Sequence, residues 1–514
     1  MEKTLEIFYM SENKRVILGA SYSIIEPTGL FPLSTVAVQE GWEPKIIMGR
    51  DPYFPEIERA IEEFNPAIFG LTVYTGNHIE ASNFFKKLKS KHPDLKIIIG
   101  GPHPTYFPKE CSEYADYVVV GEGYDSFRRI LRGEASPGIL HFRKQEPTPA
   151  SYRQAFYDNS PFHKNNPIKN VMMTTGCPHS CTYCYNSSTL NEIKDSLSDE
   201  QVTEMSAALN KDQKLFLRSE RTISDVINEI EDIQRIAPET KMIYFQDDNF
   251  GLNVTWLKEF LKKYNRKYPF HVNMRFELAN PKIDRCRERI EIMREAGATG
   301  ITFAIESYSP VIRKELLNRP MPQELILESM AFLKKLGYKV RTFSILGLPL
   351  GATSVETEMG IEADLKNLEF NVLLREQTGL PSIAWASTLA PYRGTKLEKY
   401  CQKHGYYTGN NSDIPKDSYR IRSVLDFPRK WVGESLTKNN PDAWMSKEEQ
   451  ETYKDKLEAL MHMFSTFALI PKGHLLAKKF LENSDLTSSS IRSFLFEYSQ
   501  KVRYHMYDND LYSL

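Results

Sequence analysis

The chain has 514 residues, of which 41% are apolar and 26% charged, and these values are typical of a globular protein of about two to four domains. Its formal net charge of -1 gives no indication of nucleic-acid binding, and no apolar run reaches the roughly 18 residues of a membrane helix. The first ten residues include Glu2 and Glu6 and lack the apolar core of a signal peptide, so we expect a cytoplasmic protein with reduced thiols.

Five short apolar runs alternate with helix-like segments in the first third of the chain. Continuous apolar strands separated by helices indicate a parallel sheet that is covered on both faces. The runs are residues 15–19, 45–49, 67–71, 96–100 and 117–121, and the helical segments include 55–64 and 77–91. We therefore expect an α/β, Rossmann-like, doubly wound domain over residues 1–145.

Glycine-rich segments follow the last three of these strands. Ligands of such sheets bind beyond the carboxyl ends of the strands, and glycine lets the backbone approach a large flat ligand closely. The candidate binding residues are Thr72, Tyr74, Thr75, Gly76, Gly100, Gly101, Pro102, His103, Gly121, Glu122 and Gly123. The order of segments 100–105, 115–117 and 121–123 resembles the cobalamin-binding domain that precedes many radical S-adenosylmethionine enzymes. The resemblance implies that these residues bind cobalamin; the alternative is a domain that kept its fold and lost the cofactor.

The histidine that commonly ligates cobalt is absent from its usual place. Methyl-carrying cobalamin domains have an Asp-x-His-x2-Gly motif after the first strand, whereas here no histidine precedes His78 and His103 follows the fourth strand. The resemblance therefore implies cobalamin bound with its tail detached and without a histidine below the cobalt. A cobalt that receives less electron density from its lower face should favour transfer of the methyl group as a radical.

Three of the six cysteines lie together at Cys177, Cys181 and Cys184, separated by three residues and then by two. Three thiolates bind three irons of a 4Fe-4S cluster and leave the fourth iron free to chelate a small molecule. A structural zinc site normally takes four ligands, which His179 could complete only within a tight loop. The remaining cysteines, Cys111, Cys286 and Cys401, are isolated in the sequence, so zinc and a disulfide are the less favoured alternatives.

The surroundings of the cysteines strengthen the iron-sulfur interpretation. Residues 171–175 predict a buried strand, and Tyr183 places an aromatic ring directly before Cys184. This arrangement resembles the Cys-x3-Cys-x-aromatic-Cys loop of the radical S-adenosylmethionine superfamily. The resemblance implies that the free iron binds S-adenosylmethionine, which one electron from the cluster cleaves to a 5'-deoxyadenosyl radical. A flavodoxin or ferredoxin would then act as electron donor.

Strands and helices continue to alternate after the cysteines. The candidate strands are residues 242–246, 271–276, 300–305, 339–346 and 382–389, and helices are expected at 222–235, 254–264 and 322–336. With the strand before the cysteines they make six βα units. This number predicts a partial (β/α)6 barrel over residues 146–400, with functional side chains at the carboxyl ends of the strands.

Several polar residues follow these strands. The candidates for binding S-adenosylmethionine are Tyr183, Gln246, Asp247, Asp248, Arg275, Glu306, Ser307, Arg341 and Gly347. The sequence Asp-Asp-x-Phe at 247–250 resembles the signature of cobalamin-type relatives at the place where the methionyl amine is held. Alternatively, these two carboxylates cap a turn.

The resemblance also implies roles for the later strand ends. Glu306 and Ser307 correspond to ribose contacts, which suits a carboxylate facing a diol, and Gly347 lies where the backbone passes adenine. Arg275 and Arg341 are candidates for the methionyl carboxylate, with ordinary ion pairs as the alternative. Residues 388–395 are close to the family's Pro-x-Pro-Gly-Thr but depart from it at 392 and 393.

The pattern changes after residue 400. Residues 405–445 are rich in tyrosine, asparagine and proline and predict a loop or lid. A capping box at 446–449 then opens a helix. Its apolar face contains Tyr453, Leu457, Leu460, Met461, Phe464 and Phe467. We interpret His462 and His474 as helix residues rather than metal ligands, and expect a mainly helical domain over residues 401–514 that covers the substrate.

The resemblance covers residues 12–400 with its motifs in order. It implies a cobalamin-dependent radical S-adenosylmethionine methyltransferase that moves a methyl group from methylcobalamin to an unactivated carbon. The alternatives are a cyclase or rearrangement enzyme with the same cofactors and a non-catalytic cobalamin or iron sensor. The sequence does not distinguish a peptide, lipid or small-molecule substrate, nor the oligomeric state.

Overall fold

The computed structural model describes residues 13–50, 52, 54–144, 146–216, 219–410, 414, 422–436, 440–482, 486 and 488–512, with side chains up to residue 502. The chain divides into two compact units, each described separately below. The first contains the residues up to Asn166 together with Thr189–Leu215 and Ser219–Glu239, and the second contains Pro167–Ser188 and the residues from Thr240 onward. The domain boundaries at residues 145 and 400 stay a prediction.

The first unit is built on a parallel six-stranded sheet in the order β2-β1-β3-β4-β5-β6. The strands are β1 (Arg15–Ser21), β2 (Glu43–Gly49), β3 (Ile68–Thr72), β4 (Lys96–Gly100), β5 (Tyr117–Val120) and β6 (Gly138–His141). All five predicted strands are confirmed. The edge strand β6 escaped prediction because most of its residues are only half-buried, so the segment has no continuous apolar run.

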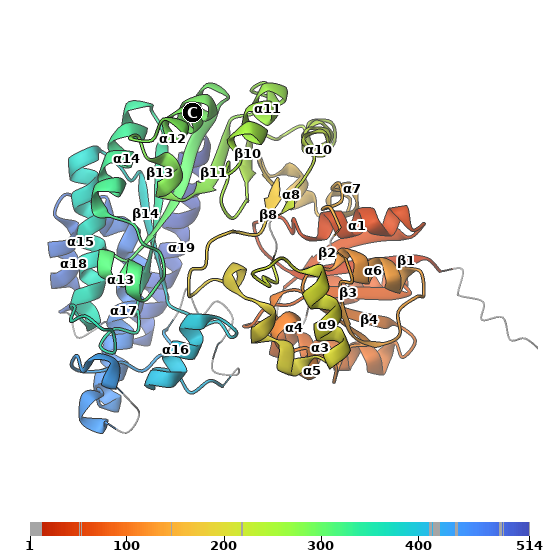
Figure 1. Ribbon diagram of the computed structural model, residues 1–514, viewed down its shortest axis with the longest axis horizontal. Coiled ribbons are helices and arrows are strands. Elements are labelled where there is room, and N and C mark those ends of the chain that lie inside the picture. Colours follow the sequence, from red (N-terminus) through yellow and green to blue (C-terminus); the bar gives the residue numbers. More distant parts are fainter. Residues whose placement is uncertain are drawn as a thin grey trace, which may run out of the picture. The chain divides into compact units, whose positions relative to one another are not determined.

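Helices cover both faces of this sheet (Figure 1). Successive side chains of β1 point to opposite faces, since Val16 and Leu18 pack in one apolar cluster and Ile17 in another. The first cluster includes α1 (Leu30–Gln39), α6 (Tyr124–Leu131) and α7 (Gln154–Tyr157); the second includes α2 (Pro55–Phe64) and α3 (His78–Lys91). The doubly wound fold is thereby confirmed. The other helices of this unit are α4 (Pro102–Tyr106), α5 (Pro108–Cys111), α8 (Pro161–Asn165), α9 (Asp199–Ala208) and α10 (Ile223–Ile236).

The second unit contains another parallel six-stranded sheet, in the order β14-β13-β12-β11-β10-β7. The strands are β7 (Ile168–Val171), β10 (Met242–Phe245), β11 (Phe270–Met274), β12 (Ala298–Glu306), β13 (Lys339–Leu346) and β14 (Ile383–Thr388). The spatial order follows the chain, with β7 and β14 at the two edges, as expected for an open barrel. The helices of this unit between them are α11 (Val254–Tyr264), α12 (Asp284–Glu295), α13 (Pro310–Glu315), α14 (Gln323–Lys335) and α15 (Gly360–Thr378), and α16 (Lys396–His404) follows β14.

The strand before the cysteines differs from its prediction. The pairing with β10 ends at Val171 instead of continuing to residue 175. The reason is Asp247, whose carboxylate accepts hydrogen bonds from the backbone N–H groups of Met173 and Thr174 at 3.1 and 2.7 Å. A side chain thus takes the backbone donors that a neighbouring strand would have used.

Three helices close the chain: α17 (Lys447–Ala468), α18 (Gly473–Leu481) and α19 (Ser489–Tyr512). The predicted capping box of α17 is present at Ser446, and its predicted apolar face is buried. That face shares one core with residues of β13 and β14, and α17 lies beside β14, where Ser465 donates a 2.8 Å hydrogen bond to the carbonyl of Ala384 (Figure 1). The predicted loop at 405–445 falls partly outside the described residues. Among those described, no helix is long and apolar enough to cross a membrane.

Candidate functional site

The loop after β7 gathers Cys177, Cys181 and Cys184. Cys181 is buried and the other two are half-buried. Burial raises the pKa of the Cys177 thiol and raises that of Cys184 to about 12, and the charge of Cys181 acts on both in the same direction. Three thiols that are close enough to repel one another as thiolates are costly without a cation between them. This soft, clustered donor set fits an iron-sulfur cluster.

The segment after β10 supports this loop. Asp247 is fully buried and holds Met173 and Thr174, including a 2.6 Å hydrogen bond from the Thr174 hydroxyl, so both its oxygens are occupied by the chain before the cysteines. Burial raises the pKa of Asp247 to about 6 against the effect of these bonds. Asp248 accepts hydrogen bonds from the backbone of Gly176 and the side chain of Asn186, both in the cysteine loop. The structure therefore gives Asp247 a positioning role and brings Asp248 to the thiols.

A cavity of about 400 Å³ opens beside the cysteine loop and is lined by Tyr183 and Glu306. The Tyr183 hydroxyl donates a 2.6 Å hydrogen bond to Glu306. Glu306 lies at a register shift that ends β12 and has a left-handed φ of 66°, which turns its side chain out of the regular alternation. Burial raises the pKa of this carboxyl, while the charge of Arg319 opposes the shift. The remaining lining comes from Ala304, Phe343, Ser344, Ile345 and the segment from Ser387 to Tyr392.

The other residues predicted to bind S-adenosylmethionine do not line this cavity. Gln246 follows β10, and its backbone N–H donates a 2.8 Å hydrogen bond to Val171; its amide nitrogen is buried and has no hydrogen-bond partner among the described residues. Ser307 and Gly347 lie next to strand ends but outside the cavity lining. Their assignment to the cofactor stays a prediction.

Two buried arginines reach the cysteine loop. Arg275, directly after β11, donates from Nη1 to the sulfur of Cys181 at 3.4 Å. Arg319, after α13, lies 4.0 Å from the same sulfur and was not among the predicted site residues. Because 138 residues separate Arg319 from Cys181, no local pattern connects them. Arg341 is the third residue of β13, far from the carboxyl end of the strand, where its charge helps burial to lower the pKa of His271.

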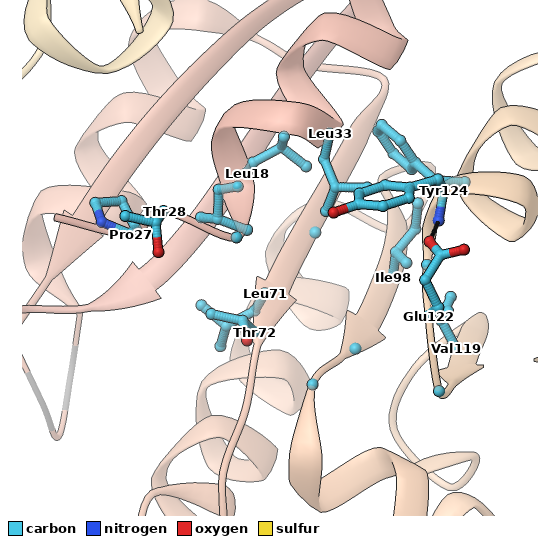
Figure 2. A pocket seen from close by; sticks show the side chains of 18 of the residues that line it. Leu18, Pro27, Thr28, Leu33, Leu71, Thr72, Ile98, Val119, Glu122 and Tyr124 are labelled. Carbon is cyan, nitrogen blue, oxygen red and sulfur yellow. Dashed lines mark hydrogen bonds between the residues drawn. The ribbon is translucent and has the colours of Figure 1, made fainter. Parts of the chain in front are cut away.

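A second cavity, of about 460 Å³, lies at the carboxyl edge of the sheet of the first unit (Figure 2). Figure 2 shows Leu18, Leu71, Ile98 and Val119 around it. The predicted residues that line it are Thr72, Gly100, Gly101, Gly121, Glu122 and Gly123. Burial raises the pKa of Glu122 to about 7, although the backbone N–H of Tyr124 donates to its carboxylate.

Glycine is required at the rim of this cavity. Gly101 has a φ of 103°, and a Cβ there would lie 2.7 Å from the Thr72 hydroxyl and 2.9 Å from the Val73 carbonyl. The mostly apolar walls and the exposed backbone, with Glu26 and Glu122 as the two carboxyl residues of the lining, fit a large, mostly uncharged ligand such as cobalamin.

The other residues predicted for cobalamin form the turns beside the cavity, outside its lining. The Tyr74 backbone N–H donates to Asn77 at 3.0 Å, Gly76 lies in the turn before α3, and Pro102 is the first residue of α4. His103 is fully buried; its Nδ1 lies 3.0 Å from the Thr75 hydroxyl and its ring stacks on His78. One ring nitrogen of His78, one of His103 and a carboxylate oxygen of Glu110 lie within 4.8 Å of one another.

Models of two protein families match this chain. The B12 binding domain matches residues 14–131, and the Radical SAM superfamily matches residues 171–355. The first range contains the residues that line the glycine-rich cavity, and the second contains the cysteine loop and the part of the Glu306 cavity that precedes residue 355. The two matches follow one another in the order that the sequence motifs indicate.

Known proteins share both halves. An uncharacterised methyltransferase of Pyrococcus horikoshii is 27% identical over 73% of this chain and 78% of its own length. The cytidylyl-2-hydroxyethylphosphonate methyltransferase of Streptomyces wedmorensis is 23% identical, covering 80% and 84%. The structure of the methyltransferase TsrM from Kitasatospora setae, with cobalamin and a 4Fe-4S cluster bound, has a similar fold, with a TM-score of 0.54 and 14% identity over 91% of this chain and 100% of that one. The chain therefore belongs to the cobalamin-dependent radical S-adenosylmethionine enzymes, whose cofactors are cobalamin, a 4Fe-4S cluster and S-adenosylmethionine.

Proposed function

We propose that this enzyme is a methyltransferase that moves a methyl group from cobalamin to an unactivated carbon of a small-molecule substrate. The observation that carries the proposal is the presence, in one chain, of a three-thiol loop beside the cavity of Glu306 and a glycine-lined cavity in a B12 binding domain. The names of the two curated relatives support methyl transfer, and one of them acts on a small phosphonate nucleotide.

In this proposal, Cys177, Cys181 and Cys184 bind the cluster. Tyr183 and Glu306 hold the nucleoside of S-adenosylmethionine, because a buried carboxylate that already accepts one hydroxyl can accept those of a ribose. Gln246 offers an unused amide nitrogen, and Asp248 offers a carboxylate to the methionyl amine. The glycine-bearing strand ends of the first unit hold cobalamin. When bound, these cofactors supply the radical and the methyl group, and the protein orients them and excludes water.

The choice of an unactivated carbon follows from the chemistry of these cofactors. A carbon with an acidic proton can be methylated by a base and S-adenosylmethionine alone, without a cluster. Radical generation is needed where no such proton exists. We also propose a cytoplasmic location and a flavodoxin-type or ferredoxin-type electron donor, since the thiolates must stay reduced to hold iron.

The test is anaerobic reconstitution with iron, sulfide and cobalamin, followed by incubation with native extract and S-adenosylmethionine labelled in its methyl group. We expect a labelled product together with S-adenosylhomocysteine and 5'-deoxyadenosine in similar amounts. 5'-Deoxyadenosine without S-adenosylhomocysteine and without label would contradict methylation and favour a cyclase or rearrangement.

Cysteine variants supply the control for this experiment. Cys181→Ala should lose iron and turnover, whereas Cys401→Ala, which removes another buried thiol in α16, should keep both. Cleavage of S-adenosylmethionine by cluster-free Cys181→Ala would contradict the assignment of the cysteines.

A further inference from the structure

The charges around the three cysteines are unequally distributed. Cys181 faces two guanidinium groups, with Arg275 Nη1 at 3.4 Å and Arg319 Nη1 at 4.0 Å from its sulfur. The carboxylate of Asp248 lies at another part of the loop, where it accepts hydrogen bonds from the backbone of Gly176, next to Cys177, and from the side chain of Asn186. Two cations therefore contact the sulfur of Cys181, while one anion is hydrogen-bonded to the backbone beside Cys177.

Both arginines are fixed in place by other parts of the fold. Each is only 6% exposed. Arg275 donates from Nη2 to Glu277 at 2.5 Å, and its backbone N–H donates to Asn249 at 3.1 Å. Arg319 donates from Nη2 to the carbonyl of Ala304 at 3.0 Å. These bonds orient the two Nη1 groups toward the sulfur of Cys181.

The guanidinium group of Arg319 keeps its charge in this buried setting. Burial opposes the charge of Arg319, but Tyr183, Glu306 and Cys181 outweigh that effect and raise its pKa. The Nε atoms of both arginines are buried and have no hydrogen-bond partner among the described residues. The single carboxylate of Glu277 interacts with both cations. Arg275 and Arg319 lower the pKa of this carboxyl, although burial alone would raise it.

We propose that Arg275 and Arg319 set the reduction potential of the cluster through Cys181, with Asp248 acting in the opposite direction. Hydrogen bonds to a cysteine sulfur and nearby positive charge favour the reduced state, which carries one more negative charge. The step concerned is the uptake of one electron from the external donor, with no bond formed or broken in the protein. The inference rests on the cluster ligation in the proposed function and is independent of methyl transfer.

The experiment is a redox titration of the reconstituted full chain, monitored by electron paramagnetic resonance without S-adenosylmethionine. Omission of that ligand matters, because an arginine that only binds its carboxylate would not change the potential. Arg275→Gln and Arg319→Gln should each move the midpoint to more negative values, by about 59 mV if the equilibrium constant for reduction falls tenfold. Arg275→Lys and Arg319→Lys keep the charge and should stay closer to wild type. Asp248→Asn should move the midpoint to more positive values.

The matched control is Arg294→Gln, which removes an arginine of the same unit whose donors go to the carbonyls of Leu336 and Ala298. Its midpoint should equal that of wild type. Iron and sulfide content shows which variants hold a complete cluster. Unchanged midpoints in fully loaded glutamine variants would overturn the proposal, as would equal shifts in the lysine and glutamine variants. A wild-type protein that holds no cluster would instead overturn the proposed function.

Discussion

The Tyr453 hydroxyl, in α17, donates a 2.7 Å hydrogen bond to the buried carboxylate of Asp364, in α15. The other carboxylate oxygen accepts the backbone N–H of Gly347 at 2.8 Å. Gly347 has a φ of 65°, and a Cβ there would lie 2.7 Å from the side chain of Leu457 in α17. Helix α17 thus holds the loop after β13. The adenine of S-adenosylmethionine is predicted to pass this loop.

Burial raises the pKa of Asp364 to about 7, and this shift predicts a pH dependence of stability. Between about pH 4 and 7 the folded chain binds this proton while the unfolded chain does not, so the stability contribution is full at low pH and is lost as pH rises through 7. Asp364→Asn should remove up to about 1.4 kcal/mol per pH unit of this dependence. Urea unfolding at about pH 5 and about pH 8 gives the free energies of unfolding whose difference measures this dependence.

The control is Glu362→Gln in the same helix, where an exposed carboxyl pairs with Lys478. We expect its free energy of unfolding to change by about 0–1 kcal/mol at either pH. If wild type and Asp364→Asn lose the same stability between the two pH values, Asp364 is ionised throughout and the prediction is wrong.

The success of sequence reasoning here depends on whether a feature is local. Strand β13 was predicted to the residue at 339–346, a segment with the β-branched and aromatic residues that favour strands, such as Val340, Phe343 and Ile345. The cysteines were found because the three candidate ligands lie within eight residues. In contrast, Arg319 meets Cys181 only through the fold, and nothing in residues 310–320 indicates that contact. Asp247 shows the intermediate case: its position was predicted, but its partners, Met173 and Thr174, come from the segment after β7.

A larger side chain at Gly100 should block the cavity of the first unit without disturbing the sheet. Its backbone φ is not positive, and a Cβ would meet only Val119, at 3.9 Å. Gly100→Val therefore adds volume on the face of the sheet that carries Ile98 and Val119, both of which line the cavity. We expect cobalamin to bind at least tenfold more weakly, equivalent to about 1.4 kcal/mol, by absorbance titration. The exposed Ser136→Val should bind like wild type, and an unchanged affinity in Gly100→Val would place cobalamin elsewhere.

Arg153 is fully buried between two carboxylates of the first unit, and its loss should be costly. It lies 3.0 Å from Glu26, in the loop before α1, and 2.7 Å from Glu229 in α10. Glu229 also pairs with Arg221, and the two arginines lower its pKa although burial alone would raise it. This cluster explains why residues 219–239 belong to the first unit although they follow the cysteines in sequence.

Arg153→Met leaves Glu26 buried without its cation and Glu229 with only one. Removal of one partner from a buried ion pair lowers the free energy of unfolding by about 3–5 kcal/mol. The reason is that the remaining charge is buried away from water without a compensating partner. Urea unfolding near neutral pH should show a loss of this size. Arg235→Met, which breaks an exposed pair with Asp232 in the same helix, should cost about 0–1 kcal/mol. Equal losses in the two variants would mean that water reaches Glu26 and Glu229 and that apolar packing alone holds α10 in the first unit.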